Sequence, residues 1–183
     1  MVRILAGGRA DPGIIIIPCP SSSPPRAAMA AEHPAGGASR APLGRETSFG
    51  GVVVRPSADG GGFELLTIVP RGTRVTGLPK GGADPGETPQ QTAAREVREE
   101  TGTTVEVDER LGEVSYWYRR NGRRIHKTVH FFLCRYVTGD TADHDHEVDD
   151  ARWIPLRDAD RLLTYPAERR LAGLALSKLS PDR

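Results

Sequence analysis

Cysteine is scarce in this chain, and aromatic residues are few. Only two cysteines occur among 183 residues, Cys19 in a stretch rich in proline and serine and Cys134 in an apolar run. Two cysteines so far apart provide neither the paired spacing of a zinc site nor the framework of a disulfide-stapled domain. We therefore expect a protein of a reducing compartment, the cytoplasm.

An excess of charge of one sign is also missing. Lys and Arg number 25 and Asp and Glu number 24, which gives a formal net charge of +1. This balance argues against a general nucleic-acid coat and against an acidic tail, so we expect no duplex nucleic acid as a partner. Any charged ligand must be recognised by a local patch.

Long hydrophobic runs are absent as well. The run Ile14–Ile17 has four apolar residues, whereas the core of a secretory signal needs about 7–15. No later run approaches the roughly 20 residues that a membrane-spanning helix requires. We expect neither export nor a membrane partner. The sequence leaves the oligomeric state open, and a homodimer is one alternative.

The N-terminal stretch differs in composition from the rest of the chain. Residues 1–44 are rich in Pro, Ser, Ala and Gly and have few periodic apolar positions, a composition typical of disorder. We expect residues 1–44 to be mostly disordered and residues 45–183 to form one domain. Met29 offers a second translation start, so the sequence leaves open whether the mature protein contains residues 1–28.

Strand patterns dominate the domain. Runs rich in β-branched residues predict strands at residues 47–56 and 63–70, joined through a glycine-rich turn. Two longer alternating runs, residues 105–120 and 123–137, flank Asn121-Gly122, the strongest short hairpin signal. These four strands are predicted to form two antiparallel hairpins.

Helix patterns occupy the centre and the end of the domain. The segment TPQQTAAREVREETG predicts a helix with Thr88 as N-cap, Pro89 at its first position, Gln91 completing a capping box and Gly102 at its end.

After a short strand at residues 151–156, a helical pattern follows over 157–179 with a break before Pro166. Leu171, Leu174 and Ala175 are expected to face the sheet. This order implies a mixed α/β sandwich rather than a doubly wound sheet.

Three glutamates gather on one face of the central helix. Glu96, Glu99 and Glu100 share an arc, with Arg95 at its edge. A charge run is usually a solvated surface, but Glu96 and Glu100 form a like-charge i,i+4 pair that costs roughly 0.2–0.5 kcal/mol. They also lie toward the helix C-terminus, where the dipole disfavours negative charge. A cation that binds there would offset both costs.

The chemistry of clustered carboxylates points to a hard divalent cation. Mg²⁺ prefers a few carboxylates together with water and phosphate oxygens. Such a cation neutralises charge while a P–O bond breaks. The expected reaction is hydrolysis of a phosphoanhydride.

The spacing around this helix resembles the signature of the Nudix hydrolase family. Gly81, Glu87 six positions later, and the run from Arg95 to Gly102 match the charged and glycine positions of the Nudix box. Thr103 is the one departure, since the family usually has an apolar residue there. We expect Thr103 to affect packing rather than chemistry.

The resemblance implies an α/β fold, a Nudix-type αβα sandwich with a mixed β-sheet, in which the box forms a loop–helix–loop that binds Mg²⁺ or Mn²⁺. By that likeness Glu96, Glu99 and Glu100 are metal ligands, and Glu96 or a downstream glutamate is the general base. Arg95 is then expected to orient a carboxylate and Glu87 to brace the box loop. Gly81 and Gly102 shape the box.

Residues outside the box are also candidates. Glu147 stands six residues before Trp153, as a further ligand or base does in many relatives. Its neighbours His144 and His146 could belong to an independent His/Asp metal site, but a solvated loop is the better interpretation because they have no second fixed partner. Lys80, in a segment LPKG also seen in relatives that cleave polyphosphates, is a candidate phosphate contact or a loop lysine that offsets the acidic helix.

The second hairpin adds candidates for the substrate. We expect Tyr118, His126 and Lys127 to contact it, while the four arginines at the hairpin tip either attract distal phosphates or are simply solvated. Tyr116 and Tyr118 point to one face and Trp117 to the other, so one set can stack on a base and the other belongs to the core.

The sequence therefore predicts a Mg²⁺-dependent pyrophosphohydrolase that acts on a small nucleoside polyphosphate, either a diadenosine polyphosphate or a nucleoside triphosphate. Two alternatives stay open, a diphosphoinositol polyphosphate hydrolase and a non-catalytic nucleotide-sensing module. The second alternative is disfavoured because modules that have lost catalysis usually lose box glutamates, and this chain keeps them all.

Overall fold

The computed structural model describes residues 17–18 and 43–180. The expected disorder of residues 1–44 and the alternative start at Met29 therefore fall almost entirely outside the described residues. The described dipeptide in that stretch forms β1 (Ile17–Pro18), which pairs with Trp117 and Tyr116.

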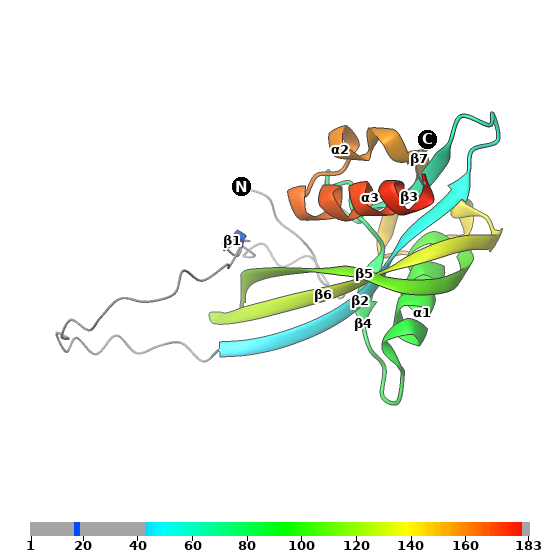
Figure 1. Ribbon diagram of the computed structural model, residues 1–183. Coiled ribbons are helices and arrows are strands. Elements are labelled where there is room, and N and C mark those ends of the chain that lie inside the picture. Colours follow the sequence, from blue (N-terminus) through cyan, green and yellow to red (C-terminus); the bar gives the residue numbers. More distant parts are fainter. Residues whose placement is uncertain (1–16, 19–42, 181–183) are drawn as a thin grey trace, which may run out of the picture.

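One mixed β-sheet organises the chain (Figure 1). Parallel pairing occurs between two of its strands and antiparallel pairing between the others, as predicted for a mixed sheet. The strands lie in the order β1, β5 (Thr103–Arg120), β6 (Arg123–Gly139), β2 (Leu43–Pro56), β3 (Phe63–Pro70) and β7 (Val148–Pro155), with β4 (Lys80–Gly82) paired to β2. The parallel pair is β2 with β6.

Helices cover the two faces of this sheet. α1 (Pro89–Thr101) lies on one face, and α3 (Pro166–Leu179) lies on the other with the short α2 (Ala159–Leu162) (Figure 1). Two 3₁₀ turns, η1 (Thr141–Asp143) and η2 (Leu156–Asp158), flank β7. The expected α/β sandwich is confirmed.

The alternation of side chains along β2 explains why both faces need a helix. Val52 and Val54 are buried in the core that contains Leu171 of α3, whereas Val53 is buried in the core that contains Val97 of α1. Successive strand residues point to opposite faces, so an apolar run buries both faces only if both are covered.

Both predicted hairpins are present. β2 and β3 pair antiparallel with Val54 opposite Leu65. Asn121 and Gly122 join β5 to β6 with φ angles of 51° and 73°. Positive φ at both central residues is the geometry of the tight turn that Asn-Gly favours.

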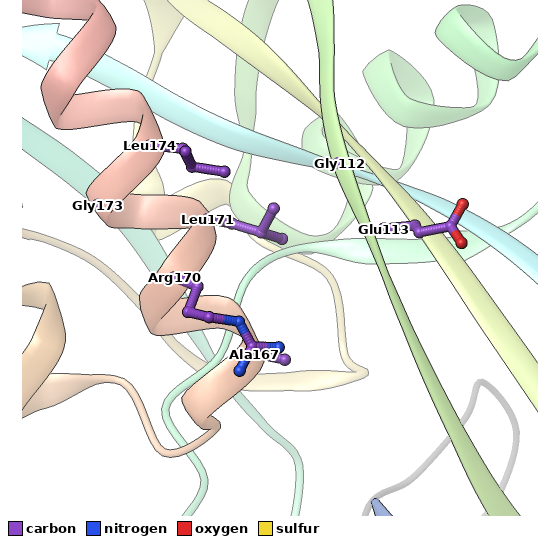
Figure 2. Close-up of a pocket in the computed structure, with 7 residues that line it drawn as sticks. All are labelled: Gly112, Glu113, Ala167, Arg170, Leu171, Gly173 and Leu174. Atoms are coloured by element: carbon purple, nitrogen blue, oxygen red, sulfur yellow. The ribbon is translucent and has the colours of Figure 1, made fainter. Parts of the chain in front are cut away.

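The sheet-facing side of α3 is only partly buried. Leu171 and Ala175 are buried, whereas Leu174 is 49% exposed, and Glu168, which was not expected on this side, is buried as well. Figure 2 shows Leu171 and Leu174 pointing from α3 toward β5, along a groove of about 440 Å³. Gly112 lines this groove, and a Cβ there would lie 2.8 Å from Leu171 Cδ2, so the strand approaches the helix closely.

The described residues include no helix that is both long and apolar enough to cross a membrane.

Candidate functional site

Local capping fixes where the carboxylate helix begins and ends. Thr88 accepts from the backbone N–H of Gln91, and the Gln91 side chain accepts from the N–H of Thr88. Gly102 ends the helix at φ 68°, and its N–H donates to the Arg98 carbonyl. Thr92, Ala93, Val97 and Thr101 form the buried side of α1, which directs its charged side away from the sheet.

The departure from the box pattern at Thr103 is a packing feature. Thr103 is fully buried, and its hydroxyl lies 2.7 Å from that of Thr101, which donates to the Val97 carbonyl. The polar side chain is therefore satisfied inside the core rather than exposed to a substrate.

Gly81 lets the helix approach β4. It stands opposite Phe49 of β2, and a Cβ on Gly81 would lie 1.9 Å from Oε2 of Glu96. No side chain fits in that space, so the glycine is required for the Glu96 carboxylate to rest against the strand. Gly82 has nothing within 4 Å of its own Cβ position.

Arg95 connects the acidic residues. Its Nε donates to Glu87 Oε1 at 2.8 Å, and its Nη1 donates to Glu96 Oε1 at 2.9 Å and to Glu99 Oε2 at 2.8 Å. Nη2 reaches the Gly82 carbonyl at 2.7 Å. Arg95 lowers the pKa of Glu87 to about 2, and Glu87 in turn raises the pKa of Arg95.

Glu87 also ties the loop to the helix. Its carboxylate accepts from the backbone N–H of Asp84 at 2.9 Å and from the Thr92 hydroxyl at 3.0 Å. These contacts hold the loop between β4 and α1 in one shape.

Two of the other box glutamates, Glu96 and Glu100, lie in drier surroundings. Burial raises the pKa of Glu96, an effect that the nearby Arg95 charge opposes. The carboxyl of Glu100 points inward and accepts from the Lys80 backbone N–H at 2.7 Å. Desolvation raises the pKa of Glu100 to about 8, against the opposing charge of Lys80. A positive ion would stabilise both carboxylates.

The loop before β7 contacts the C-terminal end of α1. The N–H of Asp145 donates to the Glu99 carbonyl at 2.9 Å. Glu147 is exposed, and its charge contributes to the raised pKa of Glu96. The charge of Asp145 likewise contributes to the raised pKa of Glu100. We had not predicted Asp145, although it lies in the same acidic run as Glu147.

The donor set suits a hard divalent cation. Glu96, Glu99 and Glu100 offer carboxylate oxygens from one helix, and burial raises the pKa of Glu96 and of Glu100, a shift that a bound cation would oppose. Among the described residues, no three His, Cys, Asp or Glu side chains converge on one point as a finished metal site. Arg95 instead donates to two of these carboxylates.

Two lysines lie on the α3 side of the sheet near β4. Lys127 stands opposite Glu46 of β2 and Tyr116 of β5, and it is 6% exposed. Burial and, to a smaller extent, the charge of Lys80 lower its pKa to about 8. Lys80 is half-buried, and its charge acts on that of Lys127. Two cations that influence each other in this way are suited to bind an anion with several negative charges.

The other two predicted substrate contacts are separated by the sheet. Tyr118 is buried in the α3-side core, where its hydroxyl donates to Glu46. His126 lies on the opposite face, with its ring centroid 4.6 Å from that of Trp117. The structure thus places Tyr116 and Tyr118 in the core and leaves Trp117 half-buried.

Glu168 of α3 is a residue that sequence reasoning missed. It is 4% exposed and accepts from the Leu78 backbone N–H at 3.1 Å. Burial raises its pKa to about 7 and Lys80 opposes the shift. Thr164 adds two hydrogen bonds with Thr76, through its N–H and its hydroxyl. The C-terminal helices therefore hold the segment that leads into Lys80.

The sequence pattern of the NUDIX domain matches residues 47–173, more than half of the chain. The chain belongs to the Nudix family. In this Nudix chain the matched region runs from β2 to α3 and contains the predicted site residues.

Known proteins resemble this Nudix chain in sequence and in structure. MutT4 of Mycobacterium tuberculosis is 40% identical over 156 residues, which cover 81% of this chain and 63% of MutT4. The 8-oxo-(d)GTP phosphatase of Mycolicibacterium smegmatis is 39% identical over 94 residues, 51% of this chain and 28% of that protein. The chain thus spans less than two thirds of either relative.

Among solved structures, the C. elegans Ap4A hydrolase superposes with a TM-score of 0.56 at 25% identity, covering 74% of this chain and 98% of that one. The Nudix chain therefore shares its fold with that protein over nearly the whole of the latter.

Proposed function

We propose that residues 45–183 form a Mg²⁺- or Mn²⁺-dependent hydrolase domain that cleaves a phosphoanhydride bond in a nucleoside polyphosphate. One observation carries the proposal: the Lys80 N–H bonds to Glu100, which joins the carboxylate helix to the segment that bears Lys80. Acidic groups for a cation and basic groups for phosphates therefore meet at β4.

Each candidate residue has its own role in the proposed reaction. Lys80 and Lys127 bind phosphate oxygens and orient the anhydride. Glu96 accepts a proton from the attacking water, with Glu147 as the further candidate, and Arg95 holds Glu96 in place through its hydrogen bond. A divalent cation held by Glu96, Glu99, Glu100 and Glu147 would neutralise charge on the phosphate oxygens.

The favoured substrates are diadenosine polyphosphates and nucleoside triphosphates. The names of the relatives, an 8-oxo-(d)GTP phosphatase and an Ap4A hydrolase, support nucleotides of this kind. A diphosphoinositol polyphosphate is the second enzymatic candidate, favoured by the paired lysines. A nucleotide-sensing module without catalysis would bind the same nucleotides and leave them intact.

A hydrolysis panel tests the proposal. The protein is incubated with dinucleoside polyphosphates, nucleoside triphosphates, ADP-ribose and inositol pyrophosphates, with Mg²⁺ or with a chelator, and the products are separated. We expect Mg²⁺-dependent cleavage of nucleotides and none by a Glu96→Gln/Glu100→Gln double variant. Nucleotide binding without cleavage would support the sensing module, and cleavage that persists with the chelator would reject the metal-dependent mechanism.

A further inference from the structure

The residues that lead into β4 are fixed by backbone hydrogen bonds to distant elements. We call residues 76–80 the lysine segment. Gly77 exchanges two hydrogen bonds with Ile68 of β3, and the Pro79 carbonyl accepts from the Gly51 N–H of β2 at 3.1 Å. The sheet therefore holds the lysine segment at Gly77 and at Pro79.

Two glutamates, one from each helix layer, bond to the lysine segment beside these positions. The Leu78 N–H donates to Oε2 of Glu168 in α3 at 3.1 Å, and the Lys80 N–H donates to Oε2 of Glu100 in α1 at 2.7 Å. The two helices cover opposite faces of the sheet (Figure 1). A Cβ on Gly77 would lie 3.2 Å from Oε2 of Glu168, so this carboxylate rests directly against the segment. Glu100 belongs to the box, whereas Glu168 lies outside it.

Glu168 stands where an apolar residue would be expected. It is 4% exposed, on the side of α3 that also buries Leu171 and Ala175. Burial of a carboxylate is unfavourable unless hydrogen bonds and an opposite charge compensate for the lost water. An apolar side chain would avoid that cost, but it could not accept the hydrogen bond from Leu78. The carboxylate is therefore best explained by this bond.

Glu168 also acts on the charge of Lys80. The Lys80 charge opposes the rise in pKa that burial causes at Glu168, and it does the same at Glu100. Among the residues that the structure describes, Lys80 forms no ion pair. The Lys80 ammonium is thus attracted by both carboxylates without being paired to either, and it can bond to an anion.

Pro79 makes the connection between Leu78 and Lys80 stiff. The proline ring fixes its own φ near −65°, and the residue before a proline is restricted to few conformations as well. A displacement of the Leu78 N–H is therefore passed on to Lys80 instead of being absorbed by a change of backbone angles.

We propose that Glu168 is a positioning residue for the reaction: through the Leu78 N–H, it sets the place at which Lys80 presents its ammonium to the phosphates of the substrate. This inference rests on the proposed function and adds to it a residue of α3 that does not itself touch the substrate. Without the acceptor, the buried Leu78 N–H would lose its partner, and the lysine segment would have to move to find another.

Two substitutions separate the hydrogen bond of Glu168 from its charge. Glu168→Gln keeps an acceptor for Leu78, whereas Glu168→Leu removes it. With Mg²⁺ and a nucleoside triphosphate at neutral pH, we expect Glu168→Leu to raise KM about tenfold and to change kcat less, because a contact with phosphate binds substrate and transition state alike. Glu168→Gln should keep both constants near those of the wild type. An unchanged KM in Glu168→Leu, or an equal loss in both variants, would overturn the inference.

Loss of stability needs its own controls. Rates are measured well below the melting temperature of each variant. Ile154→Ala removes a buried side chain of β7 opposite Leu65, which costs about 2–5 kcal/mol, and should leave KM unchanged. A KM raised equally in Ile154→Ala would reject a specific role of Glu168. If Glu168→Leu does not fold, Glu168→Asp replaces it: its carboxylate is one methylene shorter, so KM should rise, and a KM equal to that of the wild type would reject the inference.

Lys80→Ala decides whether Glu168 acts through Lys80. In a double-mutant cycle, Glu168→Leu should raise KM about tenfold in the wild type but hardly at all in Lys80→Ala, since the ammonium that it positions is then gone. A role in stability alone would give the same factor in both backgrounds. Equal factors would therefore reject the inference.

Binding measurements keep this inference distinct from the proposed function. Hydrolysis by the wild type together with an unchanged KM in Glu168→Leu would reject the role of Glu168 and leave the proposed function intact. A wild type that hydrolyses no substrate would reject the proposed function. The Kd of the same nucleoside triphosphate, measured by calorimetry with Mg²⁺, then tests Glu168 separately: a Kd about tenfold higher in Glu168→Leu would support the positioning of Lys80, and equal Kd values would reject it.

Discussion

The backbone N–H of Lys80 donates a hydrogen bond to Oε2 of Glu100, with nitrogen and oxygen 2.7 Å apart. This bond ties β4 to the last turn of α1, and it directs a carboxylate inward whose pKa burial raises to about 8. The acidic helix and the lysine that begins β4 are thereby one structural unit, although twenty positions separate Lys80 from Glu100 in the sequence.

Substitution of Glu100 should separate catalysis from folding. The amide oxygen of Glu100→Gln can still accept from the Lys80 N–H, so we expect the far-UV spectrum and the melting temperature to stay close to the wild type. Turnover should fall by at least about a hundredfold, because the variant loses a negatively charged ligand. Glu96→Gln should act similarly. Turnover equal to that of the wild type in both variants would refute the catalytic assignment.

Gly81 and Gly82 form a matched pair for testing the approach of Glu96. A methyl at Gly81 would lie 1.9 Å from Oε2 of Glu96, so Gly81→Ala must displace that carboxylate. We expect turnover to fall by about tenfold to a hundredfold, since small misplacements of reacting groups are costly. Gly82→Ala meets nothing within 4 Å and should behave as the wild type. Equal turnover of the two variants would show that the position of Glu96 does not matter.

Mg²⁺ should stabilise the folded protein. A ligand that binds only the native state adds about 2.7 kcal/mol to the free energy of unfolding at a concentration one hundred times its Kd. We therefore expect the melting temperature to rise with millimolar Mg²⁺, and to rise less in Glu96→Gln/Glu99→Gln. NaCl at matched ionic strength is the control. A rise of the same size with NaCl would argue against a cation on the carboxylate face.

Glu168 should make stability depend on pH. Burial raises its pKa from 4.5 to about 7, so the folded state holds a proton that the unfolded state has released between these values. The stabilisation is complete below pH 4.5 and is lost as the pH rises through 7; its full size is roughly 3 kcal/mol.

Glu168→Gln keeps an acceptor for Leu78 and cannot titrate. We therefore expect the free energy of unfolding of the wild type, measured in urea without Mg²⁺, to fall relative to the variant between pH 5 and pH 8. A constant difference between the two proteins over that range would contradict the raised pKa.

Much of the fold followed from short-range pattern. The caps of α1, the Asn121-Gly122 turn and the strands around it depend on hydrogen bonds and backbone angles within a few residues, which adjacent sequence specifies. Leu174 points toward β5 (Figure 2) but stays 49% exposed, because helical periodicity predicts the direction of a side chain and not how closely the neighbouring strand packs against it, and a groove remains there.

Long-range pairing decided the rest of the site. The spacing of Glu96, Glu99 and Glu100 on a helix was enough to predict a carboxylate face, because 3.6 residues per turn is a local property. The register between β2 and β6 decides whether Lys127 or His126 lies on the α3 face of the sheet with Lys80. The hydrogen bond from the Leu78 N–H to Glu168 joins residues that are 90 positions apart. Such contacts form only when distant segments pack together, so the tertiary structure alone brings α3 to the segment that holds Lys80.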